Sequence, residues 1–190
     1  MMPEVPGASD ESVRDDATPF QQDIERWAQA AVPVLQEVAG TYGNFITYKD
    51  LANRVFKETE TSTRMLIPNF SSRLLNRVIQ ICLEQELPAL SSLVVNASDG
   101  TVGPGFDAVL RASGRDVPGT VLERERIAAA ERLECYRRCG AEVPADAEPR
   151  LTPVFEARVN PPKKAEPKPK PVCAVHGIQL PATGICDDCA

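Results

Sequence analysis

The chain has 190 residues, of which 43% are hydrophobic and only 5% aromatic, and it contains 17 prolines. This length fits one compact domain with appended segments and disfavours a large multidomain enzyme. The 21 basic and 27 acidic residues give a formal net charge of −6, which disfavours non-specific coating of nucleic acid, so any DNA contact is local.

The hydrophobicity of the chain and the placement of its cysteines indicate the cellular compartment of the protein. No apolar run approaches the roughly 20 residues of a membrane helix, and the acidic start differs from a signal peptide. Three of the six cysteines lie with the only histidine between Cys173 and Cys189, which favours metal binding over disulfides. We therefore expect a cytoplasmic protein without membrane contact.

The N-terminal part of the chain predicts a disordered tail and then a helix. Residues 1–17 are acidic and polar without periodicity, which is typical of disorder. Thr18 is the expected helix N-cap, with Pro19 in the first turn and Gln21 completing a capping box. Apolar residues then recur at helical spacing and predict a buried face: Phe20, Ile24, Trp27, Ala31, Leu35 and Val38. Pro33 predicts a kink or restart before Gly40.

The central part predicts a strand and two helices. Phe45–Tyr48 is typical of a short strand, and Thr47 with Asp50 predicts the cap of a second helix. The polar stretch 58–69 then leads to a third helix, expected to begin near Ser71.

A two-stranded wing and a charged helix are expected next. Leu90–Val95 and Thr101–Phe106 are typical of extended strands, and Asn96–Gly100 is typical of the turn between them. Thr120 with Glu123 predicts another capping box, whose helix runs to about Cys139 before Gly140. Asn160–Val172 is rich in proline and lysine, which predicts a stiff, solvated spacer.

These elements predict an α+β, mainly α, fold: a winged helix-turn-helix with extra flanking helices, a proline-rich linker and a small C-terminal zinc knuckle. We expect an acidic tail at 1–17, the winged domain at 18–112 and a charged helix with an irregular segment at 113–159. The linker is expected at 160–172 and the knuckle at 173–190.

The third helix carries a polar face suited to DNA. Arg73, Asn76, Arg77 and Gln80 recur at helical spacing, and their side chains are chemically able to contact guanine or adenine edges. The alternative is that this face is only the solvated side of a core helix. The candidate DNA-contacting residues are Tyr48, Ser72, Arg73, Asn76, Arg77 and Gln80.

Three stretches carry a resemblance to a known family. They are Gly43–Ala52 with its Thr-Tyr-x-x-Leu-Ala motif, the helix that starts at Ser72-Arg73, and Leu87–Gly100. Together, residues 43–106 resemble the DNA-binding half of alkylguanine-DNA alkyltransferases and alkyltransferase-like proteins. The resemblance implies that Tyr48 helps to turn a target nucleotide and that Arg73 fills the gap left in the duplex.

At one position the chain departs from that family and lacks the residue that the family's reaction requires. Pro88-Ala89-Leu90-Ser91 stands where the family has its reactive Pro-Cys-His-Arg, so the thiol is missing and alkyl transfer is excluded. Gly103–Phe106 is also similar to the tail of small actinobacterial and phage winged-helix proteins. No complete catalytic set can be assembled from the sequence, so we expect a protein that is not an enzyme.

The C-terminal segment has the ligand spacing of a structural zinc site. Cys173 with His176, and Cys186 with Cys189, are two pairs of zinc-type donors, each separated by two residues. Gly177 and Gly184 are expected to permit tight turns. The alternatives are two redox pairs or accidental clustering. We expect structural Zn²⁺ with four protein ligands, which leaves no open position for a substrate. Cys82, Cys135 and Cys139 are expected to have packing or spectator roles.

Two functions remain open. The leading hypothesis is a DNA-binding winged-helix protein with a structural zinc knuckle, which acts as a transcriptional regulator or DNA-targeting accessory factor on double-stranded DNA. The alternative is an interaction adaptor, such as a phage or host-takeover factor, in which winged helix and knuckle bind a protein partner. The acidic Asp187 and Asp188 favour the alternative, and the linker lysines favour nucleic acid.

Overall fold

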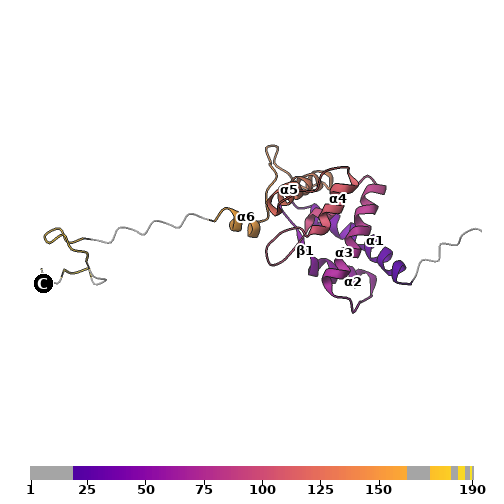
Figure 1. Cartoon of the computed structure of the whole chain (residues 1–190), viewed down its shortest axis with the longest axis horizontal. Coiled ribbons are helices and arrows are strands. Elements are labelled where there is room, and N and C mark those ends of the chain that lie inside the picture. Colours follow the sequence, from indigo (N-terminus) through magenta and orange to yellow (C-terminus); the bar gives the residue numbers. More distant parts are fainter. Residues whose placement is uncertain (1–18, 162–171, 181–183, 187–188, 190) are drawn as a thin grey trace, which may run out of the picture. The chain divides into compact units, whose positions relative to one another are not determined.

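The computed structural model describes residues 19–161, 172–180, 184–186 and 189. It divides into one compact unit that ends at Val159 and another that begins at Asn160. The predicted acidic tail, the Thr18 cap and residues 162–171 of the predicted linker lie outside the described residues. The described helices all belong to the first unit, where α1 to α5 lie together in one body (Figure 1).

Helix α1 spans Pro19–Ala39 and passes through Pro33 as one helix, so of the two outcomes predicted at Pro33, a kink or a restart, the restart does not occur. Its predicted apolar face is confirmed, because Trp27 and Leu35 are buried. Because Pro33 has no backbone N–H, the carbonyl of Gln29, four residues earlier, lacks its usual helical donor. Pro33 and Gln29 are both exposed. Water can therefore satisfy the carbonyl, and the helix continues.

Strand β1, Ile46–Thr47, leads directly into α2, Tyr48–Thr59. The predicted cap is confirmed, because the Asp50 backbone N–H donates to Thr47 Oγ1 at 3.1 Å. Glu60 then adopts φ 52°, a left-handed conformation that ends the helix.

Helix α3 spans Ile67–Glu84 and begins one turn before the predicted start at Ser71. Leu66 precedes the helix, and Pro68 lies in its first turn, where a missing backbone donor has little cost. The added turn buries Phe70 completely. The position of Pro68 therefore favours a helix start one turn earlier than the predicted one.

The small sheet differs from the predicted wing. Strand β2, Val94–Val95, pairs in parallel with β1, with Ile46 opposite Val94 and Thr47 opposite Val95. Leu90–Leu93 forms the 3₁₀ helix η1, and Pro104–Phe106 forms η2, so the predicted hairpin of Leu90–Val95 with Thr101–Phe106 is wrong. Residues of η1 and β2 are buried without alternation, which is typical of a parallel strand inside a core.

Three further helices complete the first unit: α4, Asp107–Ala112; α5, Val121–Arg138; and α6, Pro153–Val159. The predicted capping box of α5 is confirmed, because Thr120 and Glu123 each bind the other's backbone N–H. Helices α4 and α6 were not predicted. The mainly helical α+β class is confirmed, whereas a winged arrangement is not.

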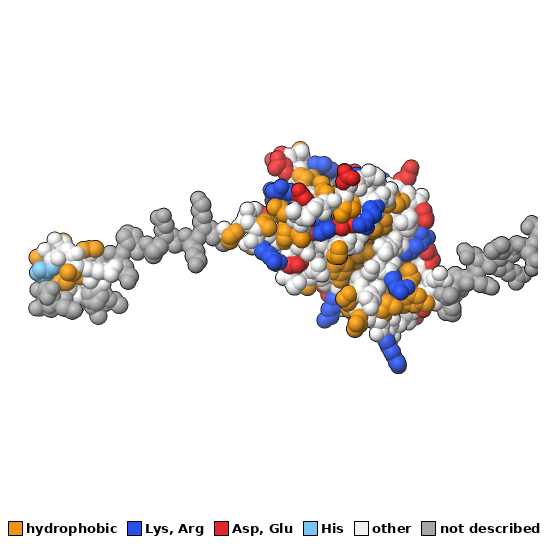
Figure 2. Space-filling model, in the orientation of Figure 1, with side chains coloured by type: hydrophobic (Ala, Val, Ile, Leu, Met, Phe, Trp, Pro, Cys, Tyr) orange, Lys and Arg blue, Asp and Glu red, His pale blue; other side chains and the backbone are white. Residues whose placement is uncertain are grey.

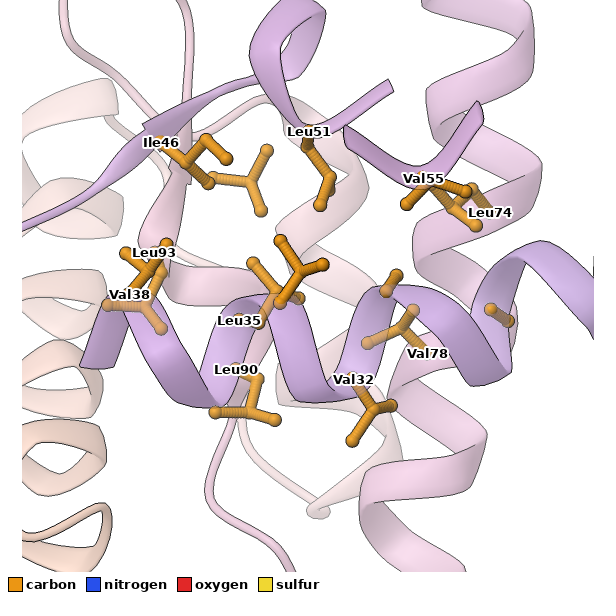
Figure 3. Packing of buried hydrophobic residues seen from close by; sticks show 14 of the residues in the cluster. Val32, Leu35, Val38, Ile46, Leu51, Val55, Leu74, Val78, Leu90 and Leu93 are labelled. Atoms are coloured by element: carbon orange, nitrogen blue, oxygen red, sulfur yellow. The ribbon is translucent and has the colours of Figure 1, made fainter. Parts of the chain in front are cut away.

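The main core forms where α1 meets α2, α3 and η1. Figure 3 shows side chains of α1 among those of the other three elements, drawn from Val32, Leu35, Val38, Leu51, Val55, Leu74, Val78, Leu90 and Leu93. Trp27 contributes an edge-on contact with Phe70, with ring centroids 5.2 Å apart. This packing fixes α3 and β1 relative to one another. Among the described helices, none has both the length and the apolar character that a membrane crossing requires.

Candidate metal centre and nucleic-acid interface

A tight turn positions the first two predicted metal ligands. The Gly177 backbone N–H donates to the Cys173 carbonyl at 2.9 Å, and the Cys173 N–H donates to the Ile178 carbonyl at 2.8 Å. Gly177 has φ +65°, a conformation that favours glycine. Val172 and Gln179 pair as an isolated antiparallel bridge. The turn therefore places Cys173 and His176 on the same side.

The second pair of ligands lies on a similar turn. The Cys189 backbone N–H donates to the Cys186 carbonyl at 3.0 Å. Gly184, just before this pair, has φ +76°. Each pair therefore converges through a local turn and needs no large core.

The four donor atoms lie in one cluster, within 4.8 Å of one another. Cys173 Sγ lies 3.7 Å from Cys189 Sγ. His176 Nδ1 lies 3.8, 3.6 and 3.2 Å from the sulfurs of Cys173, Cys186 and Cys189. A tetrahedral zinc ion with ordinary bond lengths requires sulfur–sulfur edges of about 3.8 Å and sulfur–nitrogen edges of about 3.5 Å. The predicted ligands are thus brought together, and they fit a metal ion of this size.

Backbone dipoles favour the ligand form of Cys173. Hydrogen bonds from the backbone N–H groups of His176 and Val175 lower the pKa of Cys173 to about 6. The Cys173 sulfur, in turn, raises the pKa of the Cys189 thiol. Adjacent thiolates repel one another, and a divalent cation between them offsets that repulsion. Four protein donors complete a tetrahedral shell, which suits a structural ion rather than a catalytic one.

The predicted DNA-contacting residues of α3 fall into two groups. Ser72, Arg73, Asn76 and Gln80 are exposed. Arg77 is only half-exposed, because its guanidinium donates to both Glu25 of α1 and Glu84. The hydrogen bond to Glu25 and then that to Glu84 raise the pKa of Arg77. Arg77 therefore links α1 to α3 through its ion pair with Glu25. Its position on the predicted polar face of the helix did not indicate this role.

Tyr48 and α3 border a cavity of about 320 Å³. Tyr48, Ser72 and Asn76, all predicted site residues, line this cavity together. The Tyr48 hydroxyl accepts a hydrogen bond from the Gly103 N–H at 2.8 Å, which fixes the ring. The Arg73 guanidinium carbon lies 5.2 Å from the centre of the Phe20 ring. Through the shared cavity, Tyr48 thus lies beside Ser72 and Asn76 of the polar face of α3.

Other lining residues were missed by sequence reasoning. Ser91 and Asn96 add polar atoms, and Phe106 adds an apolar wall. Ser91 is buried, and its Oγ has no hydrogen-bond partner within the described residues. No charged side chain lines the described cavity. Nothing in the local sequence signals this role for Ser91, since the cavity forms through long-range packing.

A second buried polar site lies on α5, which the sequence predicted as a charged helix. Glu125 and Arg132 are both buried, with Glu125 Oε2 3.7 Å from Arg132 Nη2. Glu125 Oε1 accepts from the Val102 N–H at 2.6 Å, and Arg132 Nη1 donates to the Ser92 carbonyl at 3.1 Å. The pair therefore anchors α5 to the segment around β2.

The cysteines outside the group formed by Cys173, His176, Cys186 and Cys189 fit a packing role. Cys82 and Cys135 are buried, and Cys139 is half-buried. Burial raises the pKa of Cys135 to about 12, so this thiol stays protonated and unreactive at neutral pH.

Comparison with protein families, with curated proteins and with solved structures gave no match to the chain.

Proposed function

We propose that the C-terminal unit binds one structural zinc ion through Cys173, His176, Cys186 and Cys189. The donor distances carry this proposal, because the three sulfur–nitrogen separations and the Cys173–Cys189 sulfur separation are close to the edges of a zinc tetrahedron, and all four donors lie within 4.8 Å of one another. Zinc binding contributes on the order of 10–16 kcal/mol in modules of this size, which bury little apolar surface. The ion supplies folding energy and no catalysis.

We further propose that the helical unit is a non-enzymatic DNA-binding domain that uses α3 and its neighbouring cavity. The observation that supports this is the convergence of Tyr48, Ser72 and Asn76 on one cavity, with Arg73 exposed on the same helix. In this proposal Arg73 fills the gap left in the duplex, as the resemblance to alkyltransferases implies, and brings local positive charge in an acidic protein. A transcriptional regulator or a DNA-targeting accessory factor fits this arrangement.

The chemistry of the cavity favours a nucleobase over a phosphate. Its described lining is uncharged and combines apolar walls with the neutral polar groups of Ser91, Asn76 and Asn96. A base is planar and neutral, and it is recognised by hydrogen bonds to its edge together with apolar contacts to its faces. In this proposal an extruded base enters the cavity beside Tyr48, as the resemblance to alkyltransferases implies, without any covalent step.

Fluorescence anisotropy with a labelled duplex tests DNA binding, and 2-aminopurine in the same duplex reports on unstacking. We expect salt-sensitive binding, with a rise in 2-aminopurine fluorescence, and we expect Arg73→Ala to weaken binding. Arg126→Ala, an exposed arginine on α5, is the matched control. Absence of duplex binding at low salt would overturn the proposal. Binding without a fluorescence rise would retain DNA contact and remove base extrusion.

A protein-binding adaptor is the second candidate, and two observations favour it. Arg77, one of the two arginines expected to contact DNA, is engaged by Glu25 and Glu84. In addition, the segment 172–190 contains no lysine or arginine. Pull-down with full-length protein, with and without nuclease, separates the candidates, because an adaptor retains its partner after nuclease treatment.

A further inference from the structure

The lining of the cavity beside Tyr48 includes both exposed and buried side chains. Asn76 and Pro104 are exposed, whereas Ile79, Ser91 and Phe106 are buried. Figure 2 shows hydrophobic side chains at the surface over the region of α2 and α3, the two helices that border the cavity. A ligand that enters the cavity from solvent therefore meets apolar walls and the buried serine.

The hydroxyl group of Ser91 is buried without a partner. Ser91 is 5% exposed, and its Oγ makes no hydrogen bond within the described residues. The neighbouring Ser92, in the same 3₁₀ helix η1, differs, because its Oγ lies 3.7 Å from Cys135 Sγ. A buried hydroxyl that has lost its bonds to water costs free energy. A polar atom of a bound ligand would offset that cost at Ser91.

Ser91 also borders a second cavity, of about 230 Å³, which residues of α3, α4 and α5 line. The charged lining residues of this second cavity are engaged with the protein itself: Arg115 pairs with Glu131 at 2.8 Å, and Arg138 donates to the Glu86 carbonyl. The cavity beside Tyr48 is lined instead by neutral polar groups within the described residues. A neutral heterocycle is therefore matched by the cavity beside Tyr48.

We propose that the Ser91 hydroxyl is the specificity-determining contact of this cavity and hydrogen-bonds to the polar edge of an extruded nucleobase. This inference rests on the proposed DNA-binding function and deepens it. A hydroxyl group both donates and accepts, so it pairs with the edge of a base but not with an apolar group of the same shape. An analogue that leaves a buried polar group unpaired is rejected by the site.

The test measures, by fluorescence anisotropy, the affinity of the full-length protein for short duplexes with one target position. The target lies opposite an abasic site, so that its extrusion breaks no base pair. It is thymine, adenine, or a nonpolar isostere of either that keeps the shape and lacks the hydrogen-bonding groups. We expect each natural base to bind more tightly than its isostere by at least about fivefold, and Ser91→Ala to remove this preference. Because both proteins bind the same duplexes, differences in stacking cancel.

Two further measurements separate recognition from a structural role. Ser92→Ala is the matched control, because Ser92 is fully buried in the same 3₁₀ helix and is absent from the cavity lining. This variant should keep the preference for natural bases. Ser91→Ala should not lower the urea midpoint of unfolding, because the missing hydroxyl has no partner to lose. A lowered midpoint would assign Ser91 a structural role and count against the proposal.

The outcomes distinguish this proposal from the DNA-binding function on which it rests. Equal affinity of the wild-type protein for base and isostere, or a preference that persists in Ser91→Ala, would overturn the role of Ser91. Either result, obtained with salt-sensitive duplex binding, would leave the DNA-binding function standing. Absence of binding to every duplex at low salt would reject both.

Discussion

The Tyr48 hydroxyl oxygen accepts a hydrogen bond from the Gly103 backbone N–H at 2.8 Å, which links the start of α2 to the segment after β2. A Cβ atom added at Gly103 would lie 2.8 Å from the same oxygen. A side chain at position 103 would therefore meet the Tyr48 hydroxyl, and both residues line the cavity. Burial raises the pKa of Tyr48, so the hydroxyl stays protonated.

Replacing Gly103 tests this contact. We expect Gly103→Ala to lower the free energy of unfolding by about 1–3 kcal/mol, because the new methyl group meets the Tyr48 hydroxyl. Tyr48→Phe alone removes one hydrogen bond and costs about 1 kcal/mol. The double variant should be more stable than the sum of the two losses predicts, as measured by urea denaturation. Strict additivity would show that the two residues do not constrain one another.

The two arginines of α3 should have separable effects. Arg73→Ala is expected to weaken duplex binding and to reduce the slope of log affinity against log salt by about 1. Arg77→Ala is expected to affect duplex binding less and to lower the free energy of unfolding by roughly 0–1 kcal/mol, because Arg77 pairs with partly exposed Glu25 and Glu84. Salt titrations and urea denaturation of both variants provide the comparison. The reverse order of effects on binding would assign the DNA contact to Arg77.

The buried pair on α5 should show strong coupling. Arg132→Met is expected to cost about 3–5 kcal/mol, because it leaves the Glu125 carboxyl group buried without its partner. Adding Glu125→Gln should recover part of that loss, since glutamine can still accept from the Val102 N–H. A double-mutant cycle measured by denaturation quantifies the coupling. A double variant less stable than Arg132→Met would contradict this account.

The same pair predicts a pH dependence. Desolvation raises the pKa of Glu125 above its model-compound value of 4.5. In the interval from 4.5 up to the folded-state pKa, the native state holds more protons than the unfolded state, so rising pH favours unfolding. Relative to Glu125→Gln, the wild-type free energy of unfolding should therefore fall as pH rises above 4.5. Urea denaturation of both proteins across this range checks the sign, and a difference that grows with pH would contradict it.

Local signals in the sequence predicted the features that depend on nearby residues. The caps at Thr47 and Thr120 need only a side chain and a backbone N–H three residues away, and both form as predicted. The convergence of the four candidate metal ligands was predictable for the same reason, because each pair such as Cys173 and His176 converges within a single turn.

Long-range packing decided the features that were missed. The pairing of Val94 with Ile46 joins segments far apart in the chain, and no local signal distinguishes it from a hairpin with Thr101–Phe106. Likewise, no local signal in the predicted charged helix indicates that Glu125 and Arg132 are buried against the segment around β2. Their burial depends on partners that only the folded chain supplies.

The metal content of full-length protein purified without added metal or chelator tests the central claim most directly. Elemental analysis by mass spectrometry should find one zinc per chain, and the zinc should be lost when Cys186 is replaced by serine, because three ligands no longer close the tetrahedron. Purified wild-type protein without stoichiometric zinc, or a Cys186→Ser variant that retains it in full, would contradict the account.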